Sequence, residues 1–145
     1  MTDKVKKALR RRKRVGRRGE NIAVTFLQEK GYTIIDRNVR MKAGEIDIVV
    51  RDGLQIVFVE VKTRTSTLFS PRTGWSPGQQ KRLQQCANEY IQKAELFQLV
   101  WRIELVEVVL GKWFFCKKIT HRQAVARDYI ERYGNYGDQR VKRFP

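Results

Sequence analysis

Four charged residues near the middle of the chain have the types and spacing for metal-assisted chemistry on a phosphate ester. Glu45 and Asp47 lie in one apolar segment, and Glu60 and Lys62 lie in the next. Carboxylates among apolar residues lose solvation unless they are paired or bind a cation. Mg²⁺ binds one or two carboxylates together with substrate phosphate and water, and a lysine beside it would position or deprotonate the attacking water. The pattern favours hydrolysis of a phosphodiester with Mg²⁺ or Mn²⁺ as the cofactor.

The two segments are predicted to form a β-hairpin, because Asp52-Gly53 between β-rich runs is a strong turn signal. With these two residues as the loop, Asp47 is expected opposite Phe58, and Glu45 opposite Glu60. All four charged side chains then project from one face, with the Asp47 and Glu60 backbones roughly 7 Å apart as diagonal neighbours. The alternative interpretation is an ordinary ion pair at a strand end, with the remaining acids in solvent.

The elements around this cluster follow from hydrophobic periodicity and from turn residues. Helical spacing predicts a first helix over 17–30, and a second begins at Pro77, where Ser76 and Gln79 have the types for a capping box. Glu20 lies in the first turn of the first helix, where it either complements the helix dipole or reaches the sheet edge. Strands are expected at 32–38, 45–51, 54–63, 98–110 and 112–119, and a last helix at 121–132. This α-β-β-β-α-β-β-α order indicates an α/β fold with a single mixed β-sheet flanked by helices.

The charge of the chain indicates a polyanionic partner. Its 145 residues carry 31 Lys and Arg against 15 Asp and Glu, a formal net charge of +16. Residues 1–18 alone hold ten of the basic residues and one acid. We expect 1–15 to be a basic, flexible arm, 16–132 to be the folded domain and 133–145 to be a basic tail. The alternative for the arm is a solvated segment that only aids solubility.

Composition also excludes several classes of protein. Two cysteines and one histidine are too few for a four-ligand zinc site or a disulfide scaffold. The chain shows neither a secretory signal nor an apolar run long enough for a membrane span, so we expect a cytoplasmic protein without a membrane partner.

Several motifs together resemble a known nuclease group. Asp47 followed after twelve residues by Glu60-Val61-Lys62 resembles the signature of the restriction-endonuclease-like, PD-(D/E)xK superfamily, with Ile46 in the place of the named proline. More narrowly, Gly16-x-x-Gly19-Glu20, Gly31-Tyr32, Arg37-Asn38, Gly44-Glu45-Ile46-Asp47 and Phe58–Arg64 are similar to the YraN-like proteins of bacteria.

The resemblance implies a restriction-endonuclease-like fold and a set of site residues. Asp47, Glu60 and the Val61 carbonyl would bind the metal, Lys62 would assist the attacking water, and Glu20 would match an extra helix carboxylate of Holliday-junction-resolvase-like members. Nucleic-acid contacts are expected from Arg11, Arg12, Arg14, Arg17, Arg18, Arg64, Gln80 and Lys81. For Gln80, a surface position on a capped helix is an equal alternative.

The leading hypothesis is a Mg²⁺-dependent endonuclease that acts on DNA, including branched or flapped repair and recombination intermediates. The alternatives are a non-catalytic nucleic-acid-binding module that retains the nuclease fold, and an RNA- or ribosome-associated structural protein. Trp75, Trp101 and Trp113 are candidates for stacking on unpaired bases, most of all Trp75 in its predicted loop. A homodimer or association with other DNA-processing proteins is left open.

Overall fold

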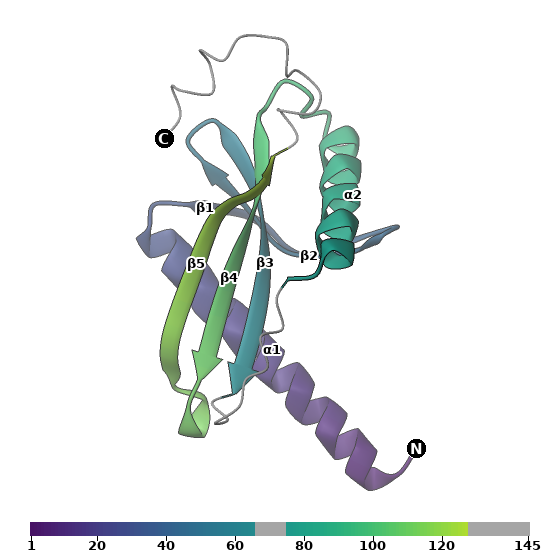
Figure 1. The fold of residues 1–145 in the computed structure, drawn as a ribbon, viewed down its shortest axis with the longest axis vertical. Coiled ribbons are helices and arrows are strands. Elements are labelled where there is room, and N and C mark those ends of the chain that lie inside the picture. Colours follow the sequence, from purple (N-terminus) through teal and green to yellow (C-terminus); the bar gives the residue numbers. More distant parts are fainter. Residues whose placement is uncertain (66–74, 128–145) are drawn as a thin grey trace.

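The computed structural model describes residues 1–65 and 75–127 of the chain, and of residues 124–127 the backbone alone. Two helices and five strands follow one another in the order α-β-β-β-α-β-β (Figure 1). Their bounds are α1 Asp3–Glu29, β1 Thr33–Met41, β2 Gly44–Asp52, β3 Gln55–Thr65, α2 Pro77–Lys93, β4 Trp101–Leu110 and β5 Cys116–Arg127, with a short 3₁₀ turn, η1, at Lys112–Phe114.

All five strands form one mixed sheet in the order β1-β2-β3-β4-β5. β3 and β4 pair in parallel, and the other neighbouring strands pair antiparallel. The parallel pair requires a crossover, which α2 supplies. The predicted α/β class with a single mixed sheet is confirmed, and the arrangement is consistent with a nuclease-like fold.

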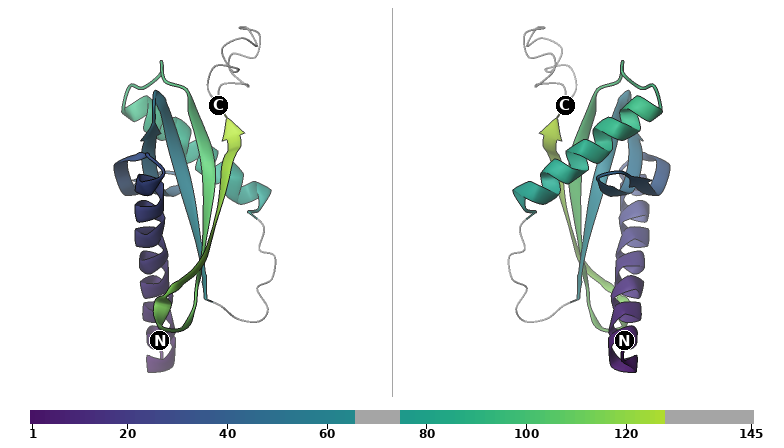
Figure 2. Two further views of the ribbon diagram at one scale, coloured as in Figure 1. Left: turned by 90° about the vertical axis from the view of Figure 1, so that its left-hand side faces the viewer. Right: turned by 90° about the vertical axis from the view of Figure 1, so that its right-hand side faces the viewer.

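The sheet lies between the two helices, so the described part of the chain has three layers (Figure 2). α1 covers one face, where Ala23 and Leu27 pack on Val57 and Val59. α2 covers the other, where Leu83 and the residues around it pack on Phe58. Strands β1 to β4 therefore each contribute apolar side chains to two cores, which is typical of a sheet with helices on both faces.

Gly19 allows α1 to approach β3 closely. A Cβ atom at this position would overlap the Thr63 side chain, whereas a Cβ at Gly16 would have no neighbour within 4 Å. Helix and sheet thus meet at Gly19, which brings the next residue, Glu20, to the edge of the strands.

The start of α2 is as the sequence predicts. Ser76 accepts a hydrogen bond from the Gln79 N–H at 3.2 Å, and the Gln79 side chain accepts one from the Ser76 N–H at 3.2 Å. With Pro77 in the first helical position, this is a complete capping box.

Two predicted elements differ in the structure. α1 begins at Asp3 rather than at residue 17, so residues 3–15 continue the helix into the expected arm. Residues 112–119 are a 3₁₀ turn followed by the start of β5, and β5 continues through Arg127, so the helix predicted from residue 121 is wrong for 121–127. The strand is favoured there because β4 offers a long edge whose backbone groups β5 satisfies.

Residues 128–132 of that predicted helix and the predicted tail, 133–145, lie outside the described residues. Within the described ranges, neither helix combines the length and the apolar character needed to cross a membrane.

Candidate functional site

The β2–β3 hairpin carries the predicted acids, but its register differs from the prediction by two residues. Asp52 pairs with Gln55, so Gly53 and Leu54 are the loop, and Ile48 pairs with Val59. Gly53 alone of the two loop residues has a positive φ, 58°, as the first position of a type II′ turn requires. The predicted Asp52-Gly53 loop is therefore wrong.

Phe58 pairs with Val49 instead of Asp47, and the observed pairing ends at Ile48 and Val59, the residues next to Asp47 and Glu60. A shift of two residues keeps every side chain of a strand on its face. The observed register therefore sets Asp47 and Glu60 beside the last pair of the ladder, each next to one of its two members.

β2 is distorted at Asp47. Residues two apart on a strand normally share a face, yet Ile46 packs in the core under α2 and Ile48 in the core under α1. Asn38, at the matching position of β1, has a left-handed φ of 52°. The Asp47 carboxylate accepts a hydrogen bond from the Val61 N–H at 2.8 Å. The carboxylate thus accepts a β3 backbone hydrogen bond that a β2 carbonyl would accept in a regular ladder.

Asp47 is poorly compensated as an anion. Burial and the neighbouring Glu60 raise its pKa to about 7, further aided by Glu20, while the Val61 hydrogen bond and the Lys62 ammonium act in the opposite direction. Raised carboxyl pKa values of this kind cluster at functional sites, although structural networks also produce them.

Glu60 and Lys62 form a close ion pair on β3, with the ammonium 2.6 Å from the Glu60 Oε1 atom. Both side chains are partly buried. They line a cleft of about 210 Å³ between the start of β2 and the first turns of α2. The lining residues are Ala43, Gly44, Glu45, Glu60, Lys62, Gln79, Arg82, Leu83 and Cys86.

Glu20 reaches the same region from α1. The Asn38 side chain, with its amide nitrogen toward the carboxylates, donates to Glu20 at 3.1 Å and to Glu45 at 3.2 Å. The Arg37 guanidinium lies 3.9 Å from the same oxygen that Asn38 contacts, Glu20 Oε2. Burial raises the pKa of Glu20, against the opposing effects of Asn38 and Arg37. Helix and hairpin therefore bring Glu20, Glu45 and Asp47 into one electrostatically coupled cluster.

The sequence analysis assigned no site role to Gln79 and Arg82, the two polar side chains among the four α2 residues that line the cleft. Gln79, Arg82, Leu83 and Cys86 recur at the spacing of one helix face, which was the available signal. Gln80, which the family resemblance assigned to substrate, donates from its side chain to the Trp75 carbonyl at 3.1 Å. Its neighbour Lys81 is exposed.

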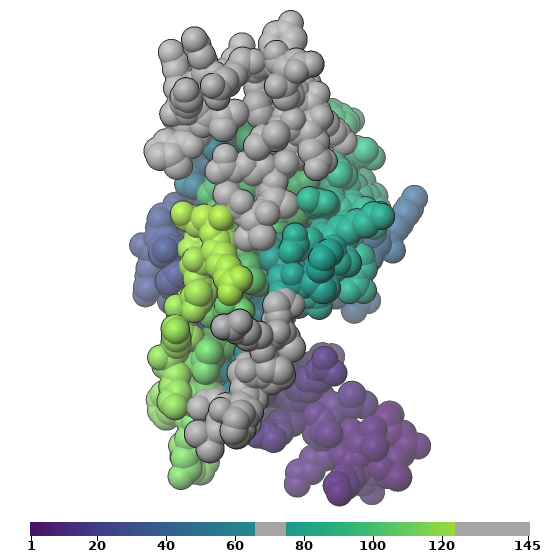
Figure 3. Space-filling view, in the orientation of Figure 1, coloured from purple at the N-terminus to yellow at the C-terminus, as the bar shows by residue number. Residues whose placement is uncertain are grey.

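The arginines expected to contact nucleic acid lie mainly along α1. Arg11, Arg12, Arg14, Arg17 and Arg18 are all exposed. Figure 3 shows the N-terminal half of this helix standing clear of the body of the molecule. Arg64, near the end of β3, is half-buried.

The donor set suits a hard cation that is completed by substrate. Among the residues that the structure describes, no three Asp, Glu, His or Cys side chains are arranged as a metal site by themselves. Asp47 and Glu60 together supply two carboxylates, and burial and the Glu60 charge raise the pKa of Asp47. Mg²⁺ is commonly held by one or two carboxylates with waters and substrate phosphate, so the residues fit this ion.

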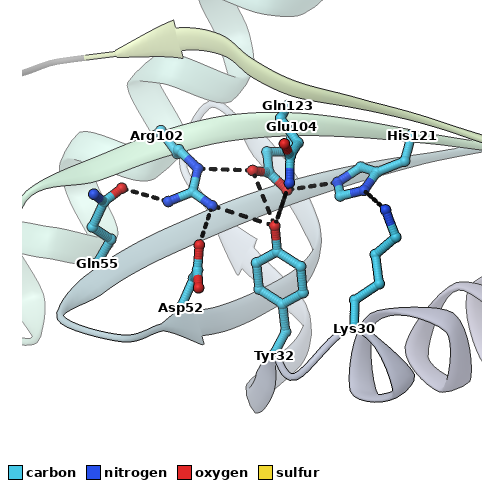
Figure 4. Close-up of polar contacts among 8 residues, drawn as sticks. All are labelled: Lys30, Tyr32, Asp52, Gln55, Arg102, Glu104, His121 and Gln123. Atoms are coloured by element: carbon cyan, nitrogen blue, oxygen red, sulfur yellow. Dashed lines mark hydrogen bonds and ion pairs between the residues drawn. The ribbon is translucent and has the colours of Figure 1, made fainter. Parts of the chain in front are cut away.

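A second polar cluster lies around Glu104 of β4, which is fully buried (Figure 4). Glu104 lies 2.7 Å from the Arg102 Nε atom and 2.7 Å from the His121 Nε2 atom, and the Tyr32 hydroxyl donates to it at 3.3 Å. Arg102 also forms an ion pair with Asp52 at 2.6 Å and donates to Gln55. The cluster thereby joins the β2–β3 turn to β4 and β5.

Lys30 and Gln123 complete the Glu104 cluster at its edges. Sequence reasoning missed the whole cluster. The available signal was Arg102 and Glu104 at alternate positions of a mostly apolar strand, where a buried charge requires a partner.

Comparison with known proteins places these features in a family. The model of the uncharacterised protein family UPF0102 matches residues 19–108, which include α1 from Gly19, the hairpin, α2 and most of β4. A UPF0102 protein of Caldicellulosiruptor saccharolyticus is 39% identical over 101 residues, 69% of this chain and 86% of the relative. UPF0102 proteins of Shewanella sediminis and Alkaliphilus metalliredigens are each 41% identical, over 67% and 69% of this chain and 83% and 89% of their own lengths. The chain belongs to the UPF0102 family, the YraN family that its sequence motifs resemble.

Proposed function

We propose that this protein is a Mg²⁺- or Mn²⁺-dependent nuclease that hydrolyses phosphodiester bonds in DNA. The observation that supports it most is the meeting of Asp47, Glu60 and Lys62 beside a cleft, on a molecule with a strongly basic helix. Acids placed together against their mutual repulsion need a counter-ion, and a nucleic-acid backbone needs cationic neutralisation. A divalent cation bound between these acids, together with the basic helix, would meet both requirements.

In this proposal Asp47, Glu60 and the Val61 carbonyl hold the cation. A bound Mg²⁺ neutralises charge on the phosphate and lowers the pKa of water. Lys62 exchanges its contact with Glu60 for one with the attacking water, which it orients toward phosphorus. Arg82 and Gln79 line the other wall of the cleft, where their N–H groups donate to phosphate oxygens.

Glu20 acts from outside this pair. Its carboxylate shares Asn38 with Glu45 and adds to the negative potential at Asp47. That potential favours the bound cation over the protonated acid. Branched or flapped DNA is the substrate class we favour, in line with the likeness of Glu20 to a resolvase carboxylate.

The test compares the chain with Asp47→Asn, Glu60→Gln, Lys62→Ala and Glu20→Gln on single-stranded, duplex and branched DNA with Mg²⁺ or Mn²⁺. Glu29→Gln is the matched control, because Glu29 is an exposed acid at the far end of the same helix as Glu20. We expect cleavage to fall by about 10²-fold or more in the Asp47 and Glu60 variants, a loss typical of removing one catalytic contact. Binding of DNA, measured separately, is expected to persist.

A non-catalytic binding module is the second candidate, and the Glu60–Lys62 ion pair is the observation that favours it, because each group already has a partner. This alternative replaces the nuclease proposal if the unmodified chain cleaves none of these DNAs with either metal while binding them.

A further inference from the structure

The turn between β4 and β5 presents two aromatic side chains to solvent. Trp113 is 80% exposed and Phe115 is 70% exposed, whereas Trp75 and Trp101 are buried in the core under α2. Of the three tryptophans, Trp113 is therefore the one available for stacking, instead of Trp75. Exposed apolar side chains that lie together, unlike single ones, mark candidate interaction sites.

The backbone conformation that exposes Trp113 is energetically unfavourable. Trp113 and Phe114 both have a φ of 61°, in the left-handed region that side chains with a Cβ disfavour. Two consecutive aromatic residues in this conformation persist only where contacts hold them in place.

Phe114 and α1 supply those contacts. The Phe114 ring packs at the edge of the core under α1, with the Arg14 guanidinium 6.0 Å from its centroid. Its carbonyl accepts a hydrogen bond from the Arg18 Nε atom at 3.4 Å. The Gly111 N–H donates to the Phe115 carbonyl at 2.7 Å and closes the turn. Phe114 thus holds the turn against α1, and the Trp113 side chain is exposed to solvent.

The surroundings of the turn are cationic. The segment from Gly111 to Lys118 contains three lysines and no acid. Arg14 and Arg18 of α1 add two guanidinium groups beside Phe114. In protein–protein interfaces the central residues are depleted in lysine, whereas aromatic side chains in a cationic groove are typical of proteins that bind single-stranded nucleic acid.

We propose that this turn is a stacking site for unpaired bases, with Trp113 and Phe115 against base faces and Lys112, Lys118 and Arg14 along the phosphates. The inference deepens the proposed function, on which it rests, by naming the substrate class as nucleic acid with an unpaired stretch. A plain duplex does not meet the requirement, because its bases present no free face to a tryptophan ring.

The position of the turn relative to the acids agrees with this. Glu60 pairs with Leu105, and β4 runs five residues further to Leu110, about 17 Å at roughly 3.3 Å per residue. That separation corresponds to about five nucleotides at the spacing of a duplex strand. In Figure 1 the turn lies at the lower end of β4 and β5, and the contacts of Phe114 with Arg14 and Arg18 place it beside the middle of α1. A strand stacked on the turn would therefore follow β3 and β4 toward Asp47 and Glu60.

The test measures the affinity of the full chain for a labelled oligo(dT) and for a blunt DNA duplex, in EDTA without divalent metal. Trp113→Ala and Trp113→Gly are expected to weaken oligo(dT) binding by about 5- to 100-fold, the range for losing one stacked base. Neither change should alter duplex binding. Phe97→Ala, which removes an exposed aromatic ring between α2 and β4, is the control and should alter neither.

The Trp113→Gly variant distinguishes a loss of oligo(dT) binding from a loss of folding stability. Glycine adopts a φ of 61° without penalty, so this variant should unfold at the same or a higher temperature while losing oligo(dT) affinity. Unchanged oligo(dT) affinity in both Trp113 variants overturns the inference, and so does an equal loss on oligo(dT) and duplex. A change of oligomeric state without a change in oligo(dT) affinity would instead identify a protein interface. Because no metal is present, these results are independent of whether the Asp47 site cleaves DNA.

Discussion

Two carboxylates in this protein have opposite electrostatic surroundings. The pKa of Asp47 is raised by burial and by acids, among them Glu60. Burial alone would raise the pKa of Glu104 as well, but hydrogen bonds from His121 and Arg102 and the Arg102 charge outweigh it and lower the pKa. Glu104 is therefore stabilised by the folded chain itself, whereas Asp47 lacks compensation that a bound cation would supply.

Glu104→Gln is expected to destabilise the fold, because it removes the buried carboxylate of the two that pair with Arg102 and leaves that guanidinium with Asp52. The loss should be about 3 kcal/mol at pH 7, within the usual range for breaking a buried ion pair. A carboxyl with a lowered folded-state pKa stabilises above its unfolded value, here 4.5, and this stabilisation is lost as the pH falls through the folded-state pKa.

The difference between wild type and Glu104→Gln should accordingly shrink as the pH falls below 4.5, in urea unfolding curves at pH 7, 5 and 3. Glu29→Gln, at an exposed acid, serves as the control with little change. A difference that stays constant from pH 7 to pH 3 would show that the Glu104 charge contributes nothing.

At the scale of elements, the approach of α1 to β3 decides where Glu20 lies. Gly19→Ala adds a Cβ that would overlap Thr63, so the helix must move away from the sheet. We expect a loss of about 1–3 kcal/mol in the free energy of unfolding, as overpacking typically costs. The displacement would also withdraw Glu20 from Asn38.

Gly16→Ala is the matched variant, three residues earlier on the same helix with open space around the added Cβ. Since alanine favours helix over glycine by about 1 kcal/mol, it should be neutral or stabilising. Equal effects of the two alanines on the urea midpoint would mean that close packing at Gly19 is unimportant.

Local signals predicted the elements that depend on neighbouring residues. The capping box of Ser76 and Gln79 closes within four residues, and it is present as expected. The β2–β3 register depends instead on a distant partner, because Asp52 is held by Arg102 of β4. Residues 121–127 form a strand for the same kind of reason, since β4 supplies their hydrogen-bonding partners.

The candidate site shows the same division. Residue types and alternation were enough to select Asp47, Glu60 and Lys62. The contribution of Arg82 requires knowing that α2 faces the start of β2, and the reach of Glu20 requires the contact of Gly19 with Thr63. Spacing along the chain places Arg82 on one helix face with Leu83 and Cys86, but it gives neither the strand that this face meets nor the sheet contact of α1.

At the scale of the molecule, the positive charge is concentrated on an extended helix rather than spread evenly. α1 continues from its packed half into an exposed half, residues 3–14, that holds eight lysines and arginines. If half of these neutralise phosphates, the slope of log affinity against log salt falls by about 3–4 when they are removed.

Deleting residues 2–15 should therefore weaken DNA binding most at low salt while leaving the folded body intact, since the buried residues of α1 are Gly19, Ala23 and Leu27 and Val15 packs only at the edge of the core. Binding titrations from low to moderate salt measure the slope, and circular dichroism checks the fold. An unchanged slope would assign the arm to solubility alone.

The central claim is that carboxylates from β2 and β3 hold a divalent cation against a polynucleotide. Crystals soaked in Mn²⁺ with a short oligonucleotide, measured for anomalous scattering, test it most directly. The account predicts a manganese peak bonded to the Asp47 and Glu60 carboxylates, with Lys62 released from Glu60 toward a water. A map with no manganese at these oxygens, and with the Lys62 ammonium still on Glu60, would contradict it.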